Sequence, residues 1–126
     1  MKEKKYVLLI DDEPDFLETI SFWLKSKGHN VKTASSGQEA LKIIEQDEPR
    51  LVFLDLNMPD MDGIQVLREI RKRSETLPVI MVSAYCADPR MKDANTLKIS
   101  GMFPKNGTFD QLGNVLEVTL RTYKGV

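Results

Sequence analysis

The sequence has only one cysteine, almost no net charge and no long apolar run, and each of these absences excludes a class of protein. A single cysteine, Cys86, excludes an internal disulfide and suits a reducing compartment. The net charge of -1 provides no long-range attraction for nucleic acid or anionic lipid. Apolar runs are too short to span a membrane, and the first residues contain no signal-peptide core. We therefore expect a cytoplasmic protein that binds neither membrane nor nucleic acid directly.

What remains is the composition of an ordinary globular protein. Hydrophobic residues make up 41% of the chain and charged residues 29%, and 126 residues are enough for one domain with one continuous core. We find no internal repeat, low-complexity tract or linker. The prediction is one domain over residues 1–126.

Short apolar runs alternate with segments of helical period. Three runs, 6–10, 51–54 and 79–82, are continuously apolar, which is typical of parallel strands covered on both faces. Two weaker strands are predicted at 29–34 and 101–103. A β-α order repeated five times predicts an α/β domain with right-handed crossovers and helices on both faces of a parallel sheet.

The helices between the strands have recognisable ends. Gly28 can close the first helix in a left-handed conformation. Ser36 with Glu39, and Thr108 with Gln111, have the spacing of capping boxes before the second and last helices. The fourth helix has a thin apolar face, and we expect it to begin with Asp88 as N-cap and Pro89 in its first turn. The basic run 68–73 is interpreted as the solvated face of the third helix.

Polar residues follow the predicted strands at their carboxyl ends, where open parallel sheets have their functional crevice. The first strand is followed by Asp11 and Asp12, the third ends at Asp55, the fourth at Ser83, and the fifth near Lys105. Topology should bring these five side chains together. Taken singly, each has an ordinary interpretation: an acidic turn, a helix cap, a strand-end serine or a surface lysine.

Three carboxylates within a few ångströms repel one another unless a cation neutralises them. Mg²⁺ suits one or two carboxylates with a carbonyl and waters, and it also binds phosphoryl oxygens. A carboxylate beside such an ion can act as a nucleophile and form an aspartyl phosphate. Lys105 offers a positive charge and Ser83 a hydrogen-bond donor for the phosphoryl oxygens.

The chain resembles the response-regulator receiver domains of bacterial two-component signalling, including chemotaxis regulators, along nearly its whole length. Asp-x-x-Met-Pro-x-Met-Asp-Gly directly after an apolar strand is the most specific part of this resemblance. The matching stretches are Val7–Pro14, Leu54–Gly63, Val82–Ala84 and Phe103–Lys105.

The resemblance implies a flavodoxin-like (βα)₅ fold with strand order 2-1-3-4-5. It implies that Asp55 is the phosphoacceptor, that Lys105 pairs with the phosphoryl group, and that the Ser83 hydroxyl carries a conformational switch. It also implies a Mg²⁺ site, with Mn²⁺ as an alternative ion. Its ligands are Asp12, Asp55 and the backbone carbonyl of Asn57, with Asp11 acting through water.

The implied function is phosphoryl transfer from a histidine kinase or a histidine phosphotransfer protein. The change is read by a protein target or an output domain at the surface formed by the fourth helix, fifth strand and fifth helix. Such a domain catalyses only its own phosphorylation and dephosphorylation. We expect no output domain within residues 1–126. Whether the domain stands alone or belongs to a longer regulator is left open, as is phosphorylation-dependent homodimerisation.

The sequence departs from the family pattern around the fifth strand. Met102 stands where an aromatic switch residue is usual, and Met has no planar ring or hydroxyl. Asn106 follows Lys105 where proline is common. Residues 97–101 lack the Ala-Gly-Ala-like sequence that is usual before the fifth strand. Tyr85 and Asn57 occupy positions that tune access of water to the phosphoryl group.

Two other classes remain as alternatives. A phosphatase of the haloacid dehalogenase type also forms an aspartyl phosphate, but it needs a second aspartate where this chain has Asn57. A flavodoxin needs a phosphate-binding loop after the first strand, where an acidic Asp-Asp-Glu-Pro stretch would repel the cofactor phosphate.

Overall fold

The computed structural model describes residues 5–123 as five parallel strands alternating with five helices. The strand order is β2-β1-β3-β4-β5, as the resemblance implied. The strands are β1 (Tyr6–Ile10), β2 (Asn30–Ala34), β3 (Leu51–Asp55), β4 (Val79–Ser83) and β5 (Gly101–Pro104). The helices are α1 (Pro14–Ser26), α2 (Gly37–Gln46), α3 (Gly63–Arg73), α4 (Met91–Thr96) and α5 (Phe109–Tyr123).

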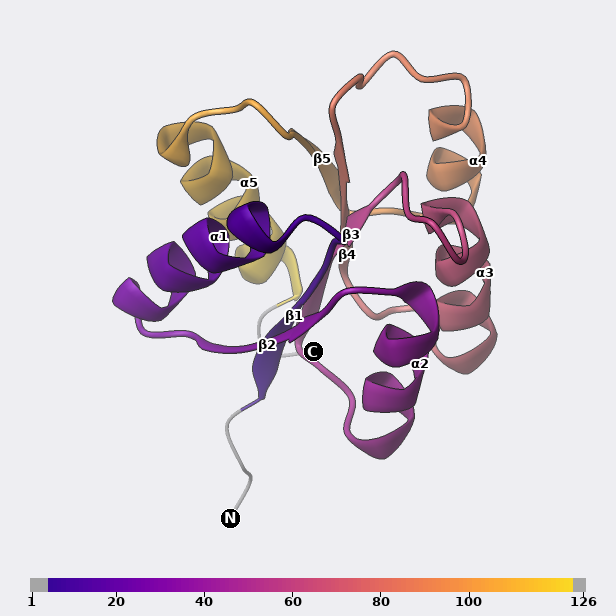
Figure 1. Ribbon diagram of the computed structural model, residues 1–126, viewed down its shortest axis with the longest axis horizontal. Helices are drawn as coiled ribbons and strands as arrows, with labels where there is room; N and C mark the ends of the chain where they lie inside the picture. Colours follow the sequence, from indigo (N-terminus) through magenta and orange to yellow (C-terminus); the bar gives the residue numbers. More distant parts are fainter. Residues whose placement is uncertain (1–4, 124–126) are drawn as a thin grey trace.

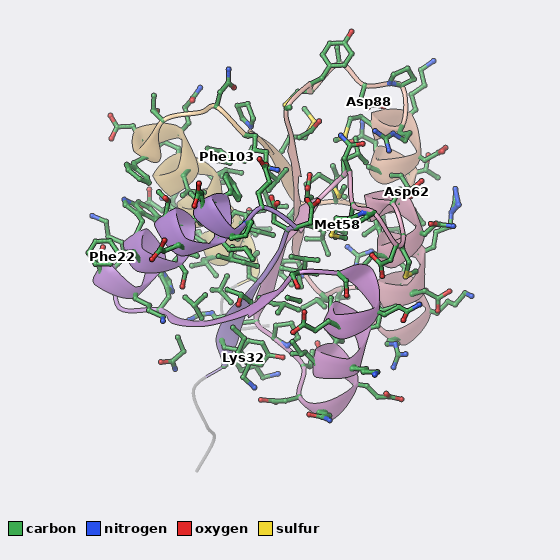
Figure 2. All side chains as sticks on the ribbon, in the orientation of Figure 1. Phe22, Lys32, Met58, Asp62, Asp88 and Phe103 are labelled. Carbon is green, nitrogen blue, oxygen red and sulfur yellow. The ribbon has the colours of Figure 1, made fainter. Side chains whose placement is uncertain are left out.

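The sheet is covered on both faces, and Figure 1 shows it nearly edge-on. Helices α1 and α5 lie on one side, and α2, α3 and α4 lie on the other. All residues of β1, β3 and β4 are buried. Their apolar side chains point alternately into one of two hydrophobic clusters, and the buried polar residues Asp55 and Ser83 end β3 and β4. Phe103 lies on the α1/α5 side and Met58 near α3 (Figure 2). The continuous apolar runs therefore arise as predicted.

Two of the four predicted helix ends, at Gly28 and at Thr108, are confirmed in full. Gly28 follows α1 with a φ of 93°, and the Thr108–Gln111 pair forms both hydrogen bonds of a capping box before α5. At α2 only half of the predicted box exists. The Ser36 hydroxyl accepts a bond from the Glu39 amide, but the Glu39 carboxylate accepts from the amide of Ser35 rather than Ser36.

The predicted start of α4 is wrong by two residues. The helix begins at Met91, and Pro89 lies in a tighter turn in front of it, where the amides of Met91 and Lys92 donate to the carbonyls three residues back. The Asp88 carboxylate accepts a hydrogen bond from the Arg90 amide within this turn. Asp88 therefore organises the approach to the helix instead of capping it.

Arg71 corrects the prediction that its basic run is only a solvated face. Its guanidinium donates to the carbonyls of Leu97 and Lys98 after α4, and to those of Ser74 and Leu77 before β4. Lys98 has a φ of 64°, the left-handed conformation that side chains rarely adopt. One arginine thus supports a segment for which the sequence offered little apolar packing.

None of the helices in residues 5–123 is long and apolar enough to cross a membrane.

Candidate functional site

The five predicted site residues converge at one edge of the sheet. In the sheet register Ile10 pairs with Leu54, Asp55 with Val82, and Ser83 with Pro104. The carboxyl ends of β1, β3, β4 and β5 are therefore level. This alignment brings Asp11, Asp55, Ser83 and Lys105 to the same edge although up to 94 residues separate them.

Asp11, Asp12 and Asp55 form a compact acidic group. One carboxylate oxygen from each lies within 4.8 Å of the others. Asp11 and Asp55 are 1% and 2% exposed, whereas Asp12 is open to solvent. Backbone amides orient the two buried groups: Glu13 N–H donates to Asp11 Oδ1 at 2.9 Å, and Asn57 N–H donates to Asp55 Oδ1 at 3.2 Å.

Lys105 supplies the positive charge of this pocket. Its Nζ lies 3.1 Å from Asp11 Oδ2 and 3.4 Å from Asp55 Oδ2. Nζ also pairs with the Glu13 carboxylate, a contact that the sequence did not predict. The ammonium is thus shared among three carboxylates, and the Phe16 ring covers it at 5.2 Å.

Burial and charge repulsion shift the pKa values in this pocket. Desolvation, followed by the nearby Asp11 charge, raises the pKa of Asp55 from 3.8 to about 6. Desolvation also raises the pKa of Asp11, against the lowering effect of Glu13 N–H and Lys105. Burial alone would lower the pKa of Lys105, but the Glu13, Asp11 and Asp55 carboxylates outweigh it and raise that pKa. The single positive charge of Lys105 does not fully neutralise the negative charges of the three carboxylates around it.

A hard divalent cation fits the donor set. Within residues 5–123, Asp11 Oδ2 is buried and accepts no hydrogen bond, although Lys105 lies nearby as an ion-pair partner. An oxygen-only group that combines two buried carboxylates with an exposed one leaves room for waters, as Mg²⁺ requires. The residues present therefore match the chemistry of Mg²⁺ or Mn²⁺.

Gly63 explains why glycine ends the Met-Asp-Gly stretch. A Cβ at this position would lie 2.5 Å from the Asp55 carbonyl oxygen and 2.7 Å from Leu56 Cα. The Gly63 amide donates to the Leu56 carbonyl at 2.8 Å. The start of α3 thus packs directly on the backbone that carries Asp55.

The other two aspartates of this loop, Asp60 and Asp62, have structural roles. Asp62 forms a capping box with Gln65 at the start of α3. Asp60 accepts hydrogen bonds from the amides of Gly37 and Gln38 at the start of α2. Neither belongs to the acidic group at the sheet edge.

The predicted switch and tuning residues Ser83, Tyr85 and Met102 lie at the end of β4, in the loop after it and on β5. Ser83 is 2% exposed; its hydroxyl donates to the Tyr85 carbonyl at 2.9 Å and accepts from the Tyr85 amide at 3.0 Å. Tyr85 is 62% exposed, so its ring does not fill the core. Met102 pairs with Met81 in the sheet register and is 42% exposed on β5.

Arg90 is a site neighbour that sequence reasoning missed. Its Nη2 donates to the side-chain oxygen of Asn57 at 2.6 Å and to Asp88 Oδ2 at 2.7 Å. No single-sequence signal could have singled it out, because the contact depends on how the turn before α4 folds.

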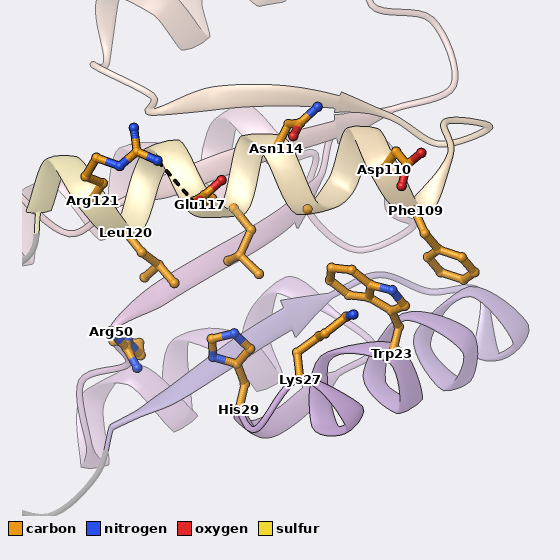
Figure 3. Close-up of a pocket in the computed structure, with 12 residues that line it drawn as sticks. Trp23, Lys27, His29, Arg50, Phe109, Asp110, Asn114, Glu117, Leu120 and Arg121 are labelled. Atoms are coloured by element: carbon orange, nitrogen blue, oxygen red, sulfur yellow. Dashed lines mark ion pairs between the residues drawn. The ribbon is translucent and has the colours of Figure 1, made fainter.

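A separate groove of about 820 Å³ lies between α1 and α5 (Figure 3). Trp23 stacks on Phe109 at one end, with a centroid distance of 5.7 Å, and His29 and Arg50 line the other end. None of the acidic-pocket residues lines this groove. It is therefore distinct from the candidate site.

Comparisons with known proteins agree with this geometry. The family model described as response regulator receiver domain matches residues 7–117. The transcriptional regulatory protein GlrR of Escherichia coli is 38% identical over 98 residues, which cover 78% of this chain and 21% of GlrR. PhoP of Bacillus subtilis is 38% identical over 80 residues, covering 64% of this chain and 33% of PhoP. The chain thus spans a fifth to a third of the length of these curated relatives.

Solved structures match over almost the whole chain. TrrA from Thermotoga maritima, described in complex with Mg²⁺-BeF, is 32% identical with a TM-score of 0.80 and covers 90% of this chain and 96% of its own. CheY4 of Vibrio cholerae has a TM-score of 0.87 at 24% identity and covers 94% of this chain and 100% of its own. At that identity the second likeness shows the fold alone.

Proposed function

Because the chain belongs to the response regulator receiver domain family, a family of phosphoaccepting signalling domains, we propose that Asp55 is its phosphoacceptor. The observation that carries the proposal is the position of the Asp55 carboxylate. It is buried at a strand end, flanked by Asp11 and Asp12, and faces the Lys105 ammonium. Of the three carboxylates, only that of Asp55 belongs to a strand residue. The start of α3 packs against the Asp55 backbone, and a Cβ at Gly63 would clash with it.

The donor in this proposal is a phosphohistidine of a kinase or phosphotransfer protein. A carboxylate oxygen of Asp55 forms a bond to phosphorus while the bond from phosphorus to the histidine nitrogen breaks. Lys105 holds positive charge beside the oxygens that gain negative charge. At neutral pH Asp55, with a pKa of about 6, is ionised in most molecules and can act as a nucleophile.

Mg²⁺ would be held by Asp12, Asp55 and the Asn57 carbonyl, with Asp11 contributing through water. When bound, it supplies charge neutralisation for the carboxylates and for the incoming phosphoryl oxygens. The residues themselves orient the donor set, because backbone amides fix both buried carboxylates.

Ser83 is our candidate for the switch. In the structure its hydroxyl is engaged with the Tyr85 backbone on both its donor and acceptor sides. A phosphoryl group on Asp55 would offer a stronger acceptor, since hydrogen bonds to charged groups are stronger than neutral ones. Release of Tyr85 would then alter the loop that leads to α4, and partners would read the change at the α4–β5–α5 surface.

The phosphatase alternative receives no support from the site. Asn57 occupies the position where such enzymes need an acidic residue, and an amide cannot exchange protons as an acid or base.

Incubation with Mg²⁺ and acetyl phosphate tests the proposal, with intact-mass measurement as the readout. We expect one phosphoryl group on the wild-type protein and on Asp60→Asn, a matched change of an exposed aspartate in the same loop. We expect none without divalent cation or in Asp55→Asn. Modification that persists in Asp55→Asn would refute the assignment.

A further inference from the structure

A chain of hydrogen bonds reaches the acidic pocket from the loop between β4 and α4. Arg90 is held by Asp88 in a two-bond fork: Nε donates to Oδ1 at 3.1 Å and Nη2 to Oδ2 at 2.7 Å. The Arg90 amide also donates to Asp88 Oδ1 at 2.9 Å. This pairing lowers the pKa of Asp88 to about 2, so the carboxylate is charged throughout the physiological range. Asp88 lies at the top of α4, on the same side of the molecule as Asp62 (Figure 2).

The Arg90 guanidinium also contacts the loop between β3 and α3. Nη2 donates to Asn57 Oδ1 at 2.6 Å, across 33 residues of sequence. The Asn57 amide in turn donates to Asp55 Oδ1 at 3.2 Å. Asn57 is thus held at two points, by its amide on the Asp55 carboxylate and by its side chain on Arg90.

We propose that Arg90 is a positioning residue for the metal pocket: through the Asn57 side chain it fixes the backbone carbonyl of Asn57 where a divalent cation can use it. The inference rests on the proposed function, because the Asn57 carbonyl matters only if the pocket holds such an ion. Arg90 does not touch the reacting atoms. It acts by restricting a loop residue that is otherwise exposed to solvent.

The two hydrogen bonds from the Arg90 guanidinium to Asp88 explain why holding Asn57 requires an arginine. Two of its nitrogens are occupied by Asp88, which fixes the plane of the guanidinium, and the same planar group still has an N–H for Asn57. A lysine has one nitrogen and cannot reproduce this geometry. Partners of metal ligands typically change metal affinity by tenfold or more when they are removed.

The sign of the effect separates positioning from simple charge. Removing a cation near an acidic pocket should strengthen binding of Mg²⁺, because repulsion falls. Loss of positioning should weaken it. We expect Arg90→Ala to bind Mg²⁺ roughly tenfold more weakly by titration calorimetry. Arg90→Lys, which keeps the charge but not the fork, should be weakened similarly.

Two further variants complete the design. Arg68→Ala removes the same charge from an exposed ion pair with Asp93 and should leave Mg²⁺ affinity within about twofold of wild type. In an Asn57→Ala background the Arg90→Ala change should no longer weaken binding, because its connection to the backbone is already gone. Amide hydrogen exchange of residues 57–61 in metal-free protein should be faster in Arg90→Ala than in wild type.

Unchanged or tighter Mg²⁺ binding by Arg90→Ala would overturn the inference, as would equal weakening in the Asn57→Ala background. Such results, with Asp55 still phosphorylated in the wild-type protein, would leave the proposed function intact. Failure of the wild-type protein to bind Mg²⁺ or accept a phosphoryl group would instead refute the proposed function itself.

Discussion

At the scale of single residues, the pocket is a compromise between stability and reactivity. Asp11 and Asp55 are buried with one shared ammonium, and both pKa values are raised. A carboxyl whose folded-state pKa is raised binds its proton more tightly in the folded protein. Between pH 3.8 and about 6 the folded state therefore holds more protons than the unfolded state, and stability falls as pH rises through this window.

The raised pKa of Asp55 predicts how Asp55→Asn changes stability. In metal-free protein at pH 8 the variant should unfold with a free energy about 1–3 kcal/mol higher than wild type, because a buried charge is removed. At pH 4 the difference should nearly vanish, since Asp55 is then protonated in the wild-type protein. Urea denaturation at the two pH values measures both quantities.

Asp60→Asn is the matched control for this prediction. The Asp60 carboxylate accepts from the amides of Gly37 and Gln38, which lowers its pKa. Its replacement should therefore lower stability at pH 8, opposite in sign to Asp55→Asn. A destabilised Asp55→Asn protein at pH 8 would show that the pocket is not under electrostatic strain.

At the scale of elements, two contacts fix the positions of α3 and of the chain after α4. Helix α3 begins directly on the backbone of Asp55, and Arg71 holds the chain between α4 and β5. Both features join segments that are separated in sequence.

Gly63→Ala should destabilise the protein by about 2–3 kcal/mol, because the new methyl group meets backbone atoms that cannot move aside. Gly113→Ala is its counterpart in α5, where a Cβ would meet the Trp23 ring at an ordinary 3.6 Å. That change should raise stability by about 0.5–1 kcal/mol through helix propensity. Equal effects of the two substitutions in thermal unfolding would contradict the assigned packing.

Arg71→Ala should cost about 2–3 kcal/mol, because four backbone carbonyls lose their charged donor. Arg71→Lys should recover only a minor part, since one ammonium cannot reach all four. Chemical denaturation supplies the stability, and amide exchange of residues 97–100 should locate the loss near α4. Arg73→Ala, at an exposed ion pair with Glu45, should have little effect.

These elements also show what the sequence could and could not predict. Strands β1, β3 and β4 were predictable because burial on both faces demands continuous apolar runs, and their ends then located Asp11, Asp55 and Ser83. The start of α4 was not, because it depends on the side chain of Asp88 within a turn. The roles of Arg71 and Arg90 rest on contacts across 26 and 33 residues, which leave no periodic pattern.

At the scale of the whole molecule, packing on both faces of the sheet positions the carboxyl ends of the strands, where the site lies. Separate hydrophobic clusters, one with α1 and α5 and one with α2, α3 and α4, cover the two faces of the sheet and hold its strands in place. Asp55, Lys105 and Ser83 belong to three different strand ends. In the proposed function, a change at Asp55 is transmitted through the β4–α4 loop to the α4–β5–α5 surface, where Met102 is 42% exposed on β5.

We expect Asp55 to be the residue at this edge of the sheet that accepts the phosphoryl group. An acyl phosphate reacts with hydroxylamine, which converts the phosphorylated aspartate into a hydroxamate that peptide mass mapping can locate. After treatment with Mg²⁺ and acetyl phosphate, we predict a hydroxamate at Asp55 alone, absent when EDTA replaces Mg²⁺. A hydroxamate at Asp11, Asp12 or any other carboxylate instead of Asp55 would contradict the account.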